Sequence, residues 1–367
     1  MTIAVHPFEH AHEPAAAAFN ARMREGRAPS TFLLPERAKP PVHNGSVTVT
    51  HHVALDEHDA VRGGLMLLEH PALIAGKTER VVNIQSPLSE GIIDPAFTFV
   101  GPQLIKHALR QSPCAFVVGM GGASNPLPRL LKAMGWTIHT VPFYFRMLDA
   151  SRCVRNLAPL RNTSMKRLGG AIAAATGAAT AGAMVVHRAS KASTGAASEF
   201  EAMPVEGWSS SADDAWDAFK SHLGFAVLRT TATLPFFYPF GGAGPTAWWL
   251  ARRGTVEGWF GLLITPMANN PYFGNLIVAT LTDCVGSAQA VRAGVALAAA
   301  QARAAGADLL ITNQQHRLLQ ESCLEAGWRA APSNYLLATS RALSAIFTPE
   351  TAYVTRRDGD GLTNLSG

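Results

Sequence analysis

The sequence predicts an α/β (α+β) protein of two tandem domains, each with a mixed, mostly antiparallel sheet flanked by helices. The chain has 367 residues, which is more than one ordinary hydrophobic core holds. Hydrophobic residues make up 48% of it and charged residues 16%, which is typical of a folded protein with large buried surfaces. One order of predicted elements also occurs twice along the chain, which indicates a duplicated fold.

The repeated order is strand, loop containing Val-Gly, helix, strand, helix, Gly-Trp and strand. Its first copy begins with residues 79–112 and its second with residues 273–306. Gly135 and Gly327 each follow a predicted helix and precede a tryptophan, and a strand with a tyrosine comes after each of them. The two copies therefore share one plan of local structure.

The repeat divides the chain into an N-terminal domain (1–150), a helical connector rich in Ala and Gly (151–210) and a C-terminal domain (211–367). Within the connector, residues 168–186 form a run of 19 residues without a charge, flanked by basic residues. Three interpretations stay open for it: a buried or interdomain helix, a membrane-surface helix that brings residues 166–191 to a lipid face, and a membrane span. The dominance of Ala, Gly and Thr makes the span the poorest of the three.

The net charge and the cysteine content of the chain exclude several classes of function. The net charge is +5 without any long run of Lys or Arg, so no nucleic acid partner is expected. The four cysteines form no C-x-x-C pair, and no spacing of histidines matches a metal site, so we expect neither a disulfide scaffold nor a bound metal. The opening residues contain no export signal, and a cytoplasmic location with membrane association as a variant is expected.

A glycine-rich turn at Gly119, Gly121 and Gly122 follows an apolar strand and precedes a predicted helix. This order is also that of a dinucleotide-binding turn, which needs a third glycine where the chain has Ser124. No acidic residue closes the following strand either. The sequence therefore argues against a nicotinamide or flavin dinucleotide site.

The order and spacing of the two copies, together with a predicted strand and helix at residues 5–26, resemble the GNAT superfamily of N-acetyltransferases, in duplicate. The resemblance covers nearly all of the chain except the connector. It implies two GNAT-like halves, each with a loop that cradles the coenzyme A pyrophosphate at a helix start, and a diverging parallel strand that leaves a wedge for the pantetheine. In this frame the glycine-rich turn lies at the mouth of the wedge.

The resemblance implies an N-acyltransferase that moves an acyl group, acetyl in the first instance, from acetyl-CoA or another acyl-CoA to an amine. The acceptor is expected to be a small molecule such as an amino sugar or an amino acid. Two alternatives stay open: an aminoacyl-tRNA-dependent aminoacyltransferase of the peptidoglycan type, and a non-catalytic GNAT-like binding protein. The sequence leaves the acceptor, the acyl length, the catalytic half and the oligomeric state undetermined.

The family's pyrophosphate loop reads R/Q-x-x-G-x-G/A and works by turning backbone N–H groups and a helix N-terminus toward the anion. Residues 283–288 fit this frame except that Asp283 replaces Arg or Gln, whereas residues 98–103 keep only the central glycine. An ordinary strand-to-helix turn is the alternative in both places. The residues expected to bind the cofactor are Val100, Gly101, Gln103, Val285, Gly286, Ser287 and Ala288.

Acyl transfer to an amine needs a base and a donor that polarises the thioester carbonyl. Glu90 is the first candidate for the base, with a solvated turn carboxylate as the alternative, and Asp283 is the second, with a helix N-cap as the alternative. Tyr144 is the candidate acid, with a core or surface aromatic as the alternative, because the family's usual tyrosine position holds Leu131 in the first half and Cys323 in the second. The residues expected around the acceptor are Asn83, Gln85, Ser86, Ser89 and Asn125.

The last polar stretch of the sequence, with Arg356, Arg357 and the Asp-Gly pairs that follow, is interpreted as a mobile tail. The alternative is a flap that uses the two arginines to hold an anionic group over the acceptor.

Overall fold

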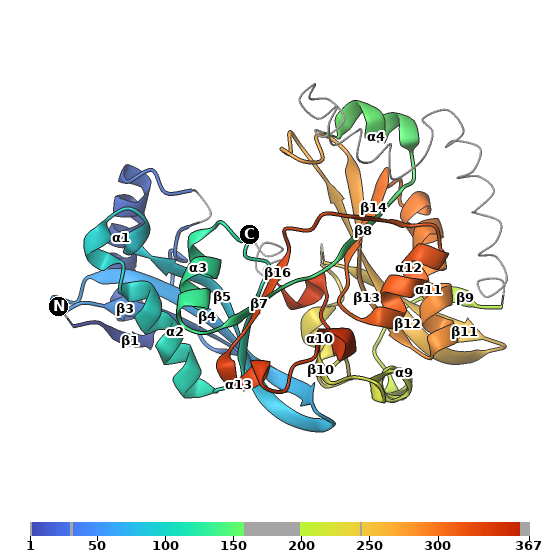
Figure 1. Ribbon diagram of the computed structural model, residues 1–367, viewed down its shortest axis with the longest axis horizontal. Coiled ribbons are helices and arrows are strands. Elements are labelled where there is room, and N and C mark those ends of the chain that lie inside the picture. Colours follow the sequence, from blue (N-terminus) through green and yellow to red (C-terminus); the bar gives the residue numbers. More distant parts are fainter. Residues whose placement is uncertain (1, 30–31, 158–198, 243, 360–367) are drawn as a thin grey trace.

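The computed structural model describes residues 2–29, 32–157, 199–242 and 244–359. These residues form two sheets side by side, with helices packed against both (Figure 1). The predicted fold class, two α/β halves with mixed and mostly antiparallel sheets, is confirmed. The run 168–186, and with it the predicted membrane contact through 166–191, lies outside the described residues.

The first sheet has the order β1-β3-β4-β5-β6-β16-β7, with β2 added on β3, β10 on β4 and β17 on β10. All of its pairs are antiparallel except β5 with β6 and β10 with β17. Its strands are β1 (Ala4–Pro7), β2 (Val42–Asn44), β3 (Val47–Leu55), β4 (Val61–Ile74), β5 (Lys77–Ser89), β6 (Ala115–Val118), β7 (Thr137–Thr140), β10 (Phe225–Val227), β16 (Leu336–Thr339) and β17 (Ala352–Tyr353).

The second sheet has the order β15-β8-β14-β13-β12-β11-β9. Here β13 and β14 are the parallel pair, and the other neighbours are antiparallel. Its strands are β8 (Phe143–Met147), β9 (Glu201–Pro204), β11 (Thr246–Arg252), β12 (Thr255–Pro266), β13 (Ile277–Gly286), β14 (Leu309–Asn313) and β15 (Arg329–Ala331).

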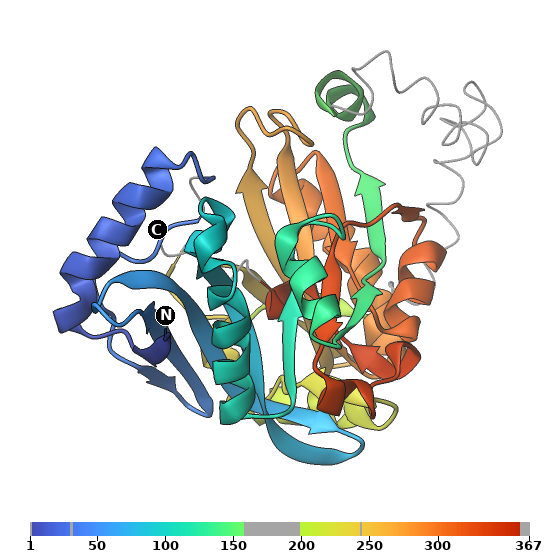
Figure 2. The same ribbon diagram turned by 60° about the vertical axis from the view of Figure 1, so that its left-hand side comes forward.

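The helices follow the repeated plan, because the parallel pairs β5–β6 and β13–β14 are each connected by one long amphipathic helix and followed by a shorter one. In the first half α2 and α3 share one hydrophobic cluster on one face of the sheet (Figure 2). The described helices are α1 (Glu13–Glu25), α2 (Val100–Gln111), α3 (Pro126–Ala133), α4 (Ala150–Asn156), α9 (Ser210–Lys220), α10 (Leu234–Phe237), α11 (Ala288–Ala304), α12 (Arg317–Glu325) and α13 (Arg341–Ser344). In this described part, no helix combines the length and the hydropathy that a membrane crossing needs.

The two sheets exchange strands. Strand β8 comes from the first half of the sequence but lies between β14 and β15 in the second sheet, and β16 comes from the second half but lies between β6 and β7 in the first (Figure 1). Pro142 separates β7 from β8 and Pro332 separates β15 from β16, at points where the sequence pattern alone predicts one continuous strand. A proline cannot donate to a sheet ladder, so each strand is broken there and its second part joins the other sheet. The division into domains by residue number stays a prediction, and strands β8 and β16 each join the sheet of the other predicted domain.

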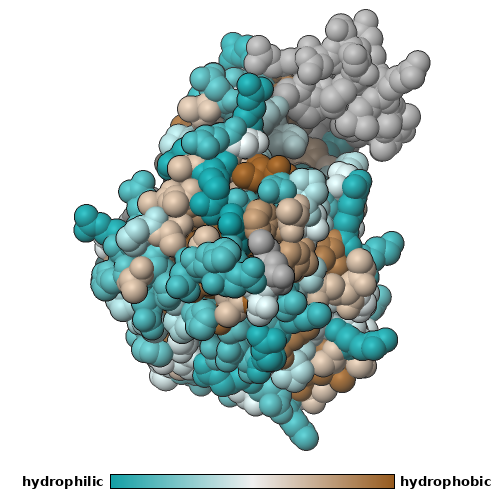
Figure 3. Space-filling model, turned by 90° about the vertical axis from the view of Figure 1, so that its left-hand side faces the viewer, coloured by the Kyte–Doolittle hydropathy of each residue, from teal (hydrophilic) through white to brown (hydrophobic). Residues whose placement is uncertain are grey.

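One hydrophobic cluster joins the halves. It contains Phe116 of β6, Phe225 of β10 and Trp259 of β12, each of which is at most 1% exposed. Full burial of such a side chain contributes roughly 1.5–3 kcal/mol, so the sheets are held together by core packing as well as by the exchanged strands. Hydrophilic side chains cover most of the face shown in Figure 3, where hydrophobic residues form small separate groups.

Candidate active site

In the first half, the parallel strands β5 and β6 pair at only two positions. Val82 lies opposite Ala115 and Asn83 opposite Phe116, after which the pairing ends while β5 continues to Ser89. In the second half, β13 and β14 pair from Val278 with Leu309 to Thr280 with Ile311, and β13 then continues to Gly286, paired with β12 but no longer with β14. Each half therefore has a parallel pair that opens at its carboxyl end.

A β-bulge lies on the longer strand of each parallel pair. In β5 the pairing with β4 shifts next to Ser86, an exposed residue whose φ of +46° lies in the left-handed region. In β13 the pairing with β12 shifts so that Thr282 is the extra residue. A bulge releases backbone groups from the ladder and turns side chains in new directions, and bulges are enriched next to active sites.

Asn83 and Gln85 lie just before the first bulge, on one face of β5. Each is 1% exposed. Asn83 Nδ2 donates a hydrogen bond of 2.6 Å to the carbonyl of Asp358, but its Oδ1, and both amide atoms of Gln85, have no partner among the described residues. Leaving a buried polar group unpaired costs about 1–3 kcal/mol. Three polar atoms at this place therefore keep their hydrogen-bonding capacity within the described part of the chain.

The structure places Glu90 in ion pairs with two arginines. Its carboxylate is 3% exposed and is held by Arg22, whose Nε lies 2.7 Å from Oε1, and by Arg62, whose Nη1 lies 3.1 Å from Oε2. The burial contradicts the alternative of a solvated turn carboxylate, and the ion pairs connect Glu90 to α1 and β4. Its role as a general base stays a prediction.

The other predicted acceptor residues hold the local turns. Ser89 Oγ accepts from the N–H of Gly91 and donates to the carbonyl of Phe97 at 3.3 Å. Asn125 Nδ2 donates to the carbonyl of Met120 at 3.0 Å and so closes the glycine-rich turn before α3. Of the five residues predicted around the acceptor, Asn83, Gln85 and Ser86 lie together at the bulge.

The three residues of the first half that are predicted to bind the cofactor lie inside α2 and not in a turn before it. Two short 3-10 turns, Glu90–Ile92 and Pro95–Phe97, connect β5 to the helix. The side chain of Val100 is fully buried in the core, whereas Gly101 and Gln103 are half-buried in the first turn of α2. The amides that could face an anion are thus those of the helix N-terminus itself.

The second loop lies where the sequence frame predicts it, between β13 and α11. Gly286 has a φ of +147°, and a Cβ there would lie 2.4 Å from the carbonyl oxygen of Glu257, so only glycine fits. Ser287 caps α11, since its Oγ accepts from the N–H of Ala290 at 3.2 Å. Val285 is buried and Ala288 is exposed at the start of the helix.

A cavity of about 420 Å³ lies against this second loop. The N-termini of α11 and α12 both lie at this cavity. Gly286 and Ala288 line it at the start of α11, and His316, the N-cap of α12, lines it at the start of that helix. Burial lowers the pKa of His316 to about 4, so its ring is neutral at pH 7, and its Nδ1 has no partner among the described residues. Two acidic side chains, Glu321 and Glu350, also line the cavity.

Asp283, the second predicted base, lies at the centre of a buried cluster of charges and hydroxyls. It is 0% exposed, and Ser287 rather than Asp283 caps α11, so the helix-cap interpretation is wrong here, whereas the role of a base stays a prediction. Arg229 bridges it to Asp358, with Nη2 2.7 Å from Oδ1 of that residue. Four groups donate to the carboxylate of Asp283: Nε of Arg229 (2.8 Å), the hydroxyls of Tyr238 and Tyr353 (2.7 Å each) and Oγ1 of Thr355 (3.1 Å).

The electrostatics of this cluster are dominated by the ion pairs of Arg229 with Asp283 and Asp358. Burial acts to lower the pKa of Arg229, but the carboxylates of Asp283 and Asp358 raise it well above its ordinary value. Burial also raises the pKa values of Tyr238 and Tyr353, which keeps both phenols protonated as hydrogen-bond donors. These ion pairs and hydrogen bonds connect β13, the segment after β10 and the C-terminal segment inside the fold.

Tyr144, the predicted acid, lies on β8 in the second sheet and is 5% exposed. Its hydroxyl donates to Oε1 of Gln320 at 3.2 Å, and burial raises its pKa. The three predicted catalytic residues are not brought together: Glu90 belongs to the first sheet, and Asp283 and Tyr144 lie on separate strands of the second.

The sequence reasoning missed the residues that contact these side chains. Arg229 and Tyr353 are both fully buried, and the part of the predicted tail that the structure describes, up to residue 359, is largely buried. Arg356 Nε donates to Oδ1 of Asn313 at 2.7 Å, and Arg357 donates to the carbonyl of Phe237. Before the two arginines, Tyr353 and Thr355 occupy every second position, a pattern that is typical of a strand. This pattern was the available sequence signal that the segment is ordered.

No family model matches the chain, and no curated protein matches it in sequence. Solved structures match it in shape. The N-myristoyltransferase of Saccharomyces cerevisiae with bound myristoyl-CoA aligns over 92% of this chain and 82% of its own, at 10% identity and a TM-score of 0.53. The GCN5-related glucosamine N-acetyltransferase region of a fungal multi-domain β-N-acetylglucosaminidase aligns over 92% of this chain and 38% of its own, at 11% identity and a TM-score of 0.50.

The chain has the GNAT fold. Since each of its sheets has its own bulged, opening parallel pair, the GNAT fold is present in two tandem halves. A tandem GNAT protein from the clavulanic acid biosynthesis pathway also aligns, over 92% of this chain and 98% of that one, at 13% identity and a TM-score of 0.46.

Proposed function

We propose that the protein is an N-acyltransferase that moves an acyl group from acyl-CoA directly to the amine of a small molecule. The observation that carries the proposal is the end of the β5–β6 pair, where the strands stop pairing next to a bulge at Ser86 and a buried amide, Gln85, lacks partners. Fold alone does not fix function, so the argument rests on this site.

The chemistry of the site suits an amide-forming reaction. A thioester carbonyl becomes more electrophilic when an N–H group points at its oxygen, and an incoming amine needs acceptors for its own hydrogens. Gln85 offers both a donor and an acceptor, and Asn83 offers a free Oδ1 beside it. Both of these side chains are uncharged amides.

We propose acetyl-CoA as the first donor to test and amino sugars and amino acids as the first acceptors. The N-terminus of α2, with the N–H of Gly101 and the side-chain amide of Gln103, would hold the pyrophosphate, because a helix N-terminus carries a partial positive charge. The glycine-rich turn before α3 has three glycines with positive φ and leaves backbone exposed near the opening of the strands.

The test is a thiol-release assay with purified full-length protein, acetyl-CoA and a panel of amines, run alongside calorimetric titration with acetyl-CoA. The proposal predicts binding of acetyl-CoA and amine-dependent release of coenzyme A. Failure of acetyl-CoA and of longer acyl-CoAs to bind would overturn it.

A non-catalytic GNAT-like binding protein is the second candidate. It is favoured by the engagement of Glu90, Asp283 and Tyr144 in hydrogen bonds and ion pairs of the fold. Acyl-CoA binding without release of coenzyme A, for every amine in the panel, would support this second candidate against the first.

A further inference from the structure

The two halves differ in what lies between their parted strands. We propose that the second half does not hold an acyl donor and that each chain binds one acyl-CoA, in the first half. This inference rests on the proposed function and deepens it, since it assigns the donor site to one of two similar halves.

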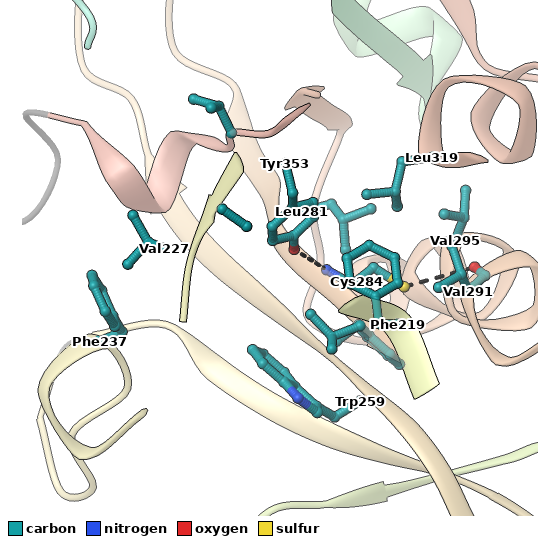
Figure 4. Close-up of a cluster of buried hydrophobic side chains, with 14 of the residues drawn as sticks. Phe219, Val227, Phe237, Trp259, Leu281, Cys284, Val291, Val295, Leu319 and Tyr353 are labelled. Atoms are coloured by element: carbon teal, nitrogen blue, oxygen red, sulfur yellow. Dashed lines mark hydrogen bonds between the residues drawn. The ribbon is translucent and has the colours of Figure 1, made fainter. Parts of the chain in front are cut away.

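In the second half the chain's own C-terminal segment, 352–355, connects the two strands that have parted. The Tyr353 hydroxyl accepts a hydrogen bond of 3.1 Å from the N–H of Cys284 on β13 (Figure 4). On the other side, the Val354 carbonyl accepts from the N–H of Gln315 at 3.2 Å, and Thr355 forms a bridge with Gln314, just beyond β14. The segment thus occupies the place that the GNAT resemblance reserves for the pantetheine.

The C-terminal segment is buried and hydrogen-bonded to the fold. Tyr353, Val354 and Thr355 are each at most 1% exposed. Tyr353 and Thr355 also donate to Asp283, which is itself paired with Arg229. A donor could enter only by exposing this charged cluster, whose members would then lose their partners.

The cavity at the second loop is closed toward the strands by three rings. Phe219 and His316 line the cavity, with ring centroids 5.1 Å apart. The ring of Tyr353 packs behind both, 5.0 Å from Phe219 and 6.4 Å from His316. A phosphate group could reach the N-terminus of α11, but an acyl chain attached to it would meet this wall.

Charge also argues against a donor in the second half. The frame that favours a basic or amide residue has Asp283 there, and its carboxylate is turned inward to Arg229. The cavity is lined by two acids, Glu321 and Glu350, and by Arg317, whose Nε lies 2.8 Å from Oε1 of Glu321. These side chains provide no net positive charge that would attract a pyrophosphate.

The same C-terminal segment contacts the first half less extensively. There it contacts β5 through the hydrogen bond from Asn83 to the Asp358 carbonyl, and it leaves both amide atoms of Gln85 without a partner among the described residues. In the described part of the chain, the segment thus forms hydrogen bonds to both sides of the opening in the second half, but only to β5 in the first.

The experiment is calorimetric titration of the full-length protein with acetyl-CoA, using a charge at each helix start. Gly101→Glu puts a carboxylate in the first turn of α2, with Gly101→Ala as its control for the side chain alone. Ala288→Glu does the same in α11, with Ala288→Gln as its control. An acid in the first turn of a helix is compatible with folding, and circular dichroism checks this for each variant.

We expect one donor per chain, an affinity weakened about tenfold or more by Gly101→Glu, and no change with Ala288→Glu. Gln103→Glu, in the same turn of α2, replaces Gly101→Glu if that variant does not fold. Two donors per chain, or a loss caused by Ala288→Glu but not by Ala288→Gln, would overturn the inference and leave the proposed function standing. Absence of any binding to the unmodified protein would overturn both.

Discussion

The hydroxyl of Tyr353 donates a hydrogen bond of 2.7 Å to Oδ1 of Asp283, and so ties the last strand of the chain to the bulged strand of the second half. The same hydroxyl accepts from the N–H of Cys284. Because these contacts join segments 70 residues apart in sequence, they fix the C-terminal segment in the space between β13 and β14.

Tyr353→Phe tests how much the hydrogen bonds of the Tyr353 hydroxyl contribute to stability. The change keeps the ring and its packing but leaves the Cys284 N–H and one oxygen of Asp283 without their partner, which should lower the free energy of unfolding by about 1–3 kcal/mol. Urea unfolding measures it. Tyr272→Phe, at a side chain that is 61% exposed, is the matched control and should change the free energy very little. Equal stabilities for the two variants would contradict this account of Tyr353.

Glu90→Ala separates a structural anchor from a catalytic base. Removal of one partner of a buried ion pair leaves the other charges uncompensated, and we expect a loss of about 3 kcal/mol, the low end of the range, since Arg22 and Arg62 are partly exposed. The catalytic rate per folded molecule should stay within a few-fold. A general base would instead contribute about 100-fold or more to that rate, so a loss of this size in folded protein would support the catalytic role.

The duplicated order of elements could be predicted from the sequence because it depends on local patterns of apolar residues, helix starts and glycines. The exchange of β8 and β16 could not, because both parts of each interrupted strand are equally apolar, and only Pro142 and Pro332 indicate a break. Nothing in the local pattern states which sheet the second part joins.

The site was harder to predict for a related reason. Glu90 is followed by glycine and lies at a strand end, where a solvated or catalytic carboxylate is a natural interpretation, but Arg22 lies 68 residues away along the chain. Asp358 lies in a polar, glycine-containing stretch and is buried by Arg229, 129 residues away. By contrast, Asn83 and Gln85 could be found from sequence, because two amides interrupt an otherwise apolar strand.

The buried histidines predict that stability falls as the solution is acidified. Burial lowers the pKa of His52 and of His316 to about 4 and that of His70 to about 3, against 6.5 in the unfolded chain. Between these values the unfolded state binds protons that the folded state does not, so the stability present above pH 6.5 is lost as pH falls toward 4. Each histidine contributes about 1.4 kcal/mol per pH unit in this window.

Urea unfolding at pH 7, 6 and 5 measures this slope. His70→Gln removes one of the three histidines and should make the slope shallower, whereas His58→Gln, at an exposed side chain, should leave it unchanged. An identical slope for His70→Gln and the unmodified protein would show that His70 is not buried in its neutral form.

Gln85→Leu should make the protein more stable and less active. The amide of Gln85 is buried without partners in the described part of the molecule, so an apolar side chain of similar size removes an unmet hydrogen-bonding demand worth about 1–3 kcal/mol. The same change removes the donor and acceptor proposed to meet the thioester and the amine, and acyl transfer should fall about tenfold or more. Asn83→Leu is the matched comparison, because it breaks the hydrogen bond to the Asp358 carbonyl and should lower stability. Urea unfolding and thiol release on both variants give the answer, and a Gln85→Leu protein that is less stable but fully active would show that this amide serves the fold and not the reaction.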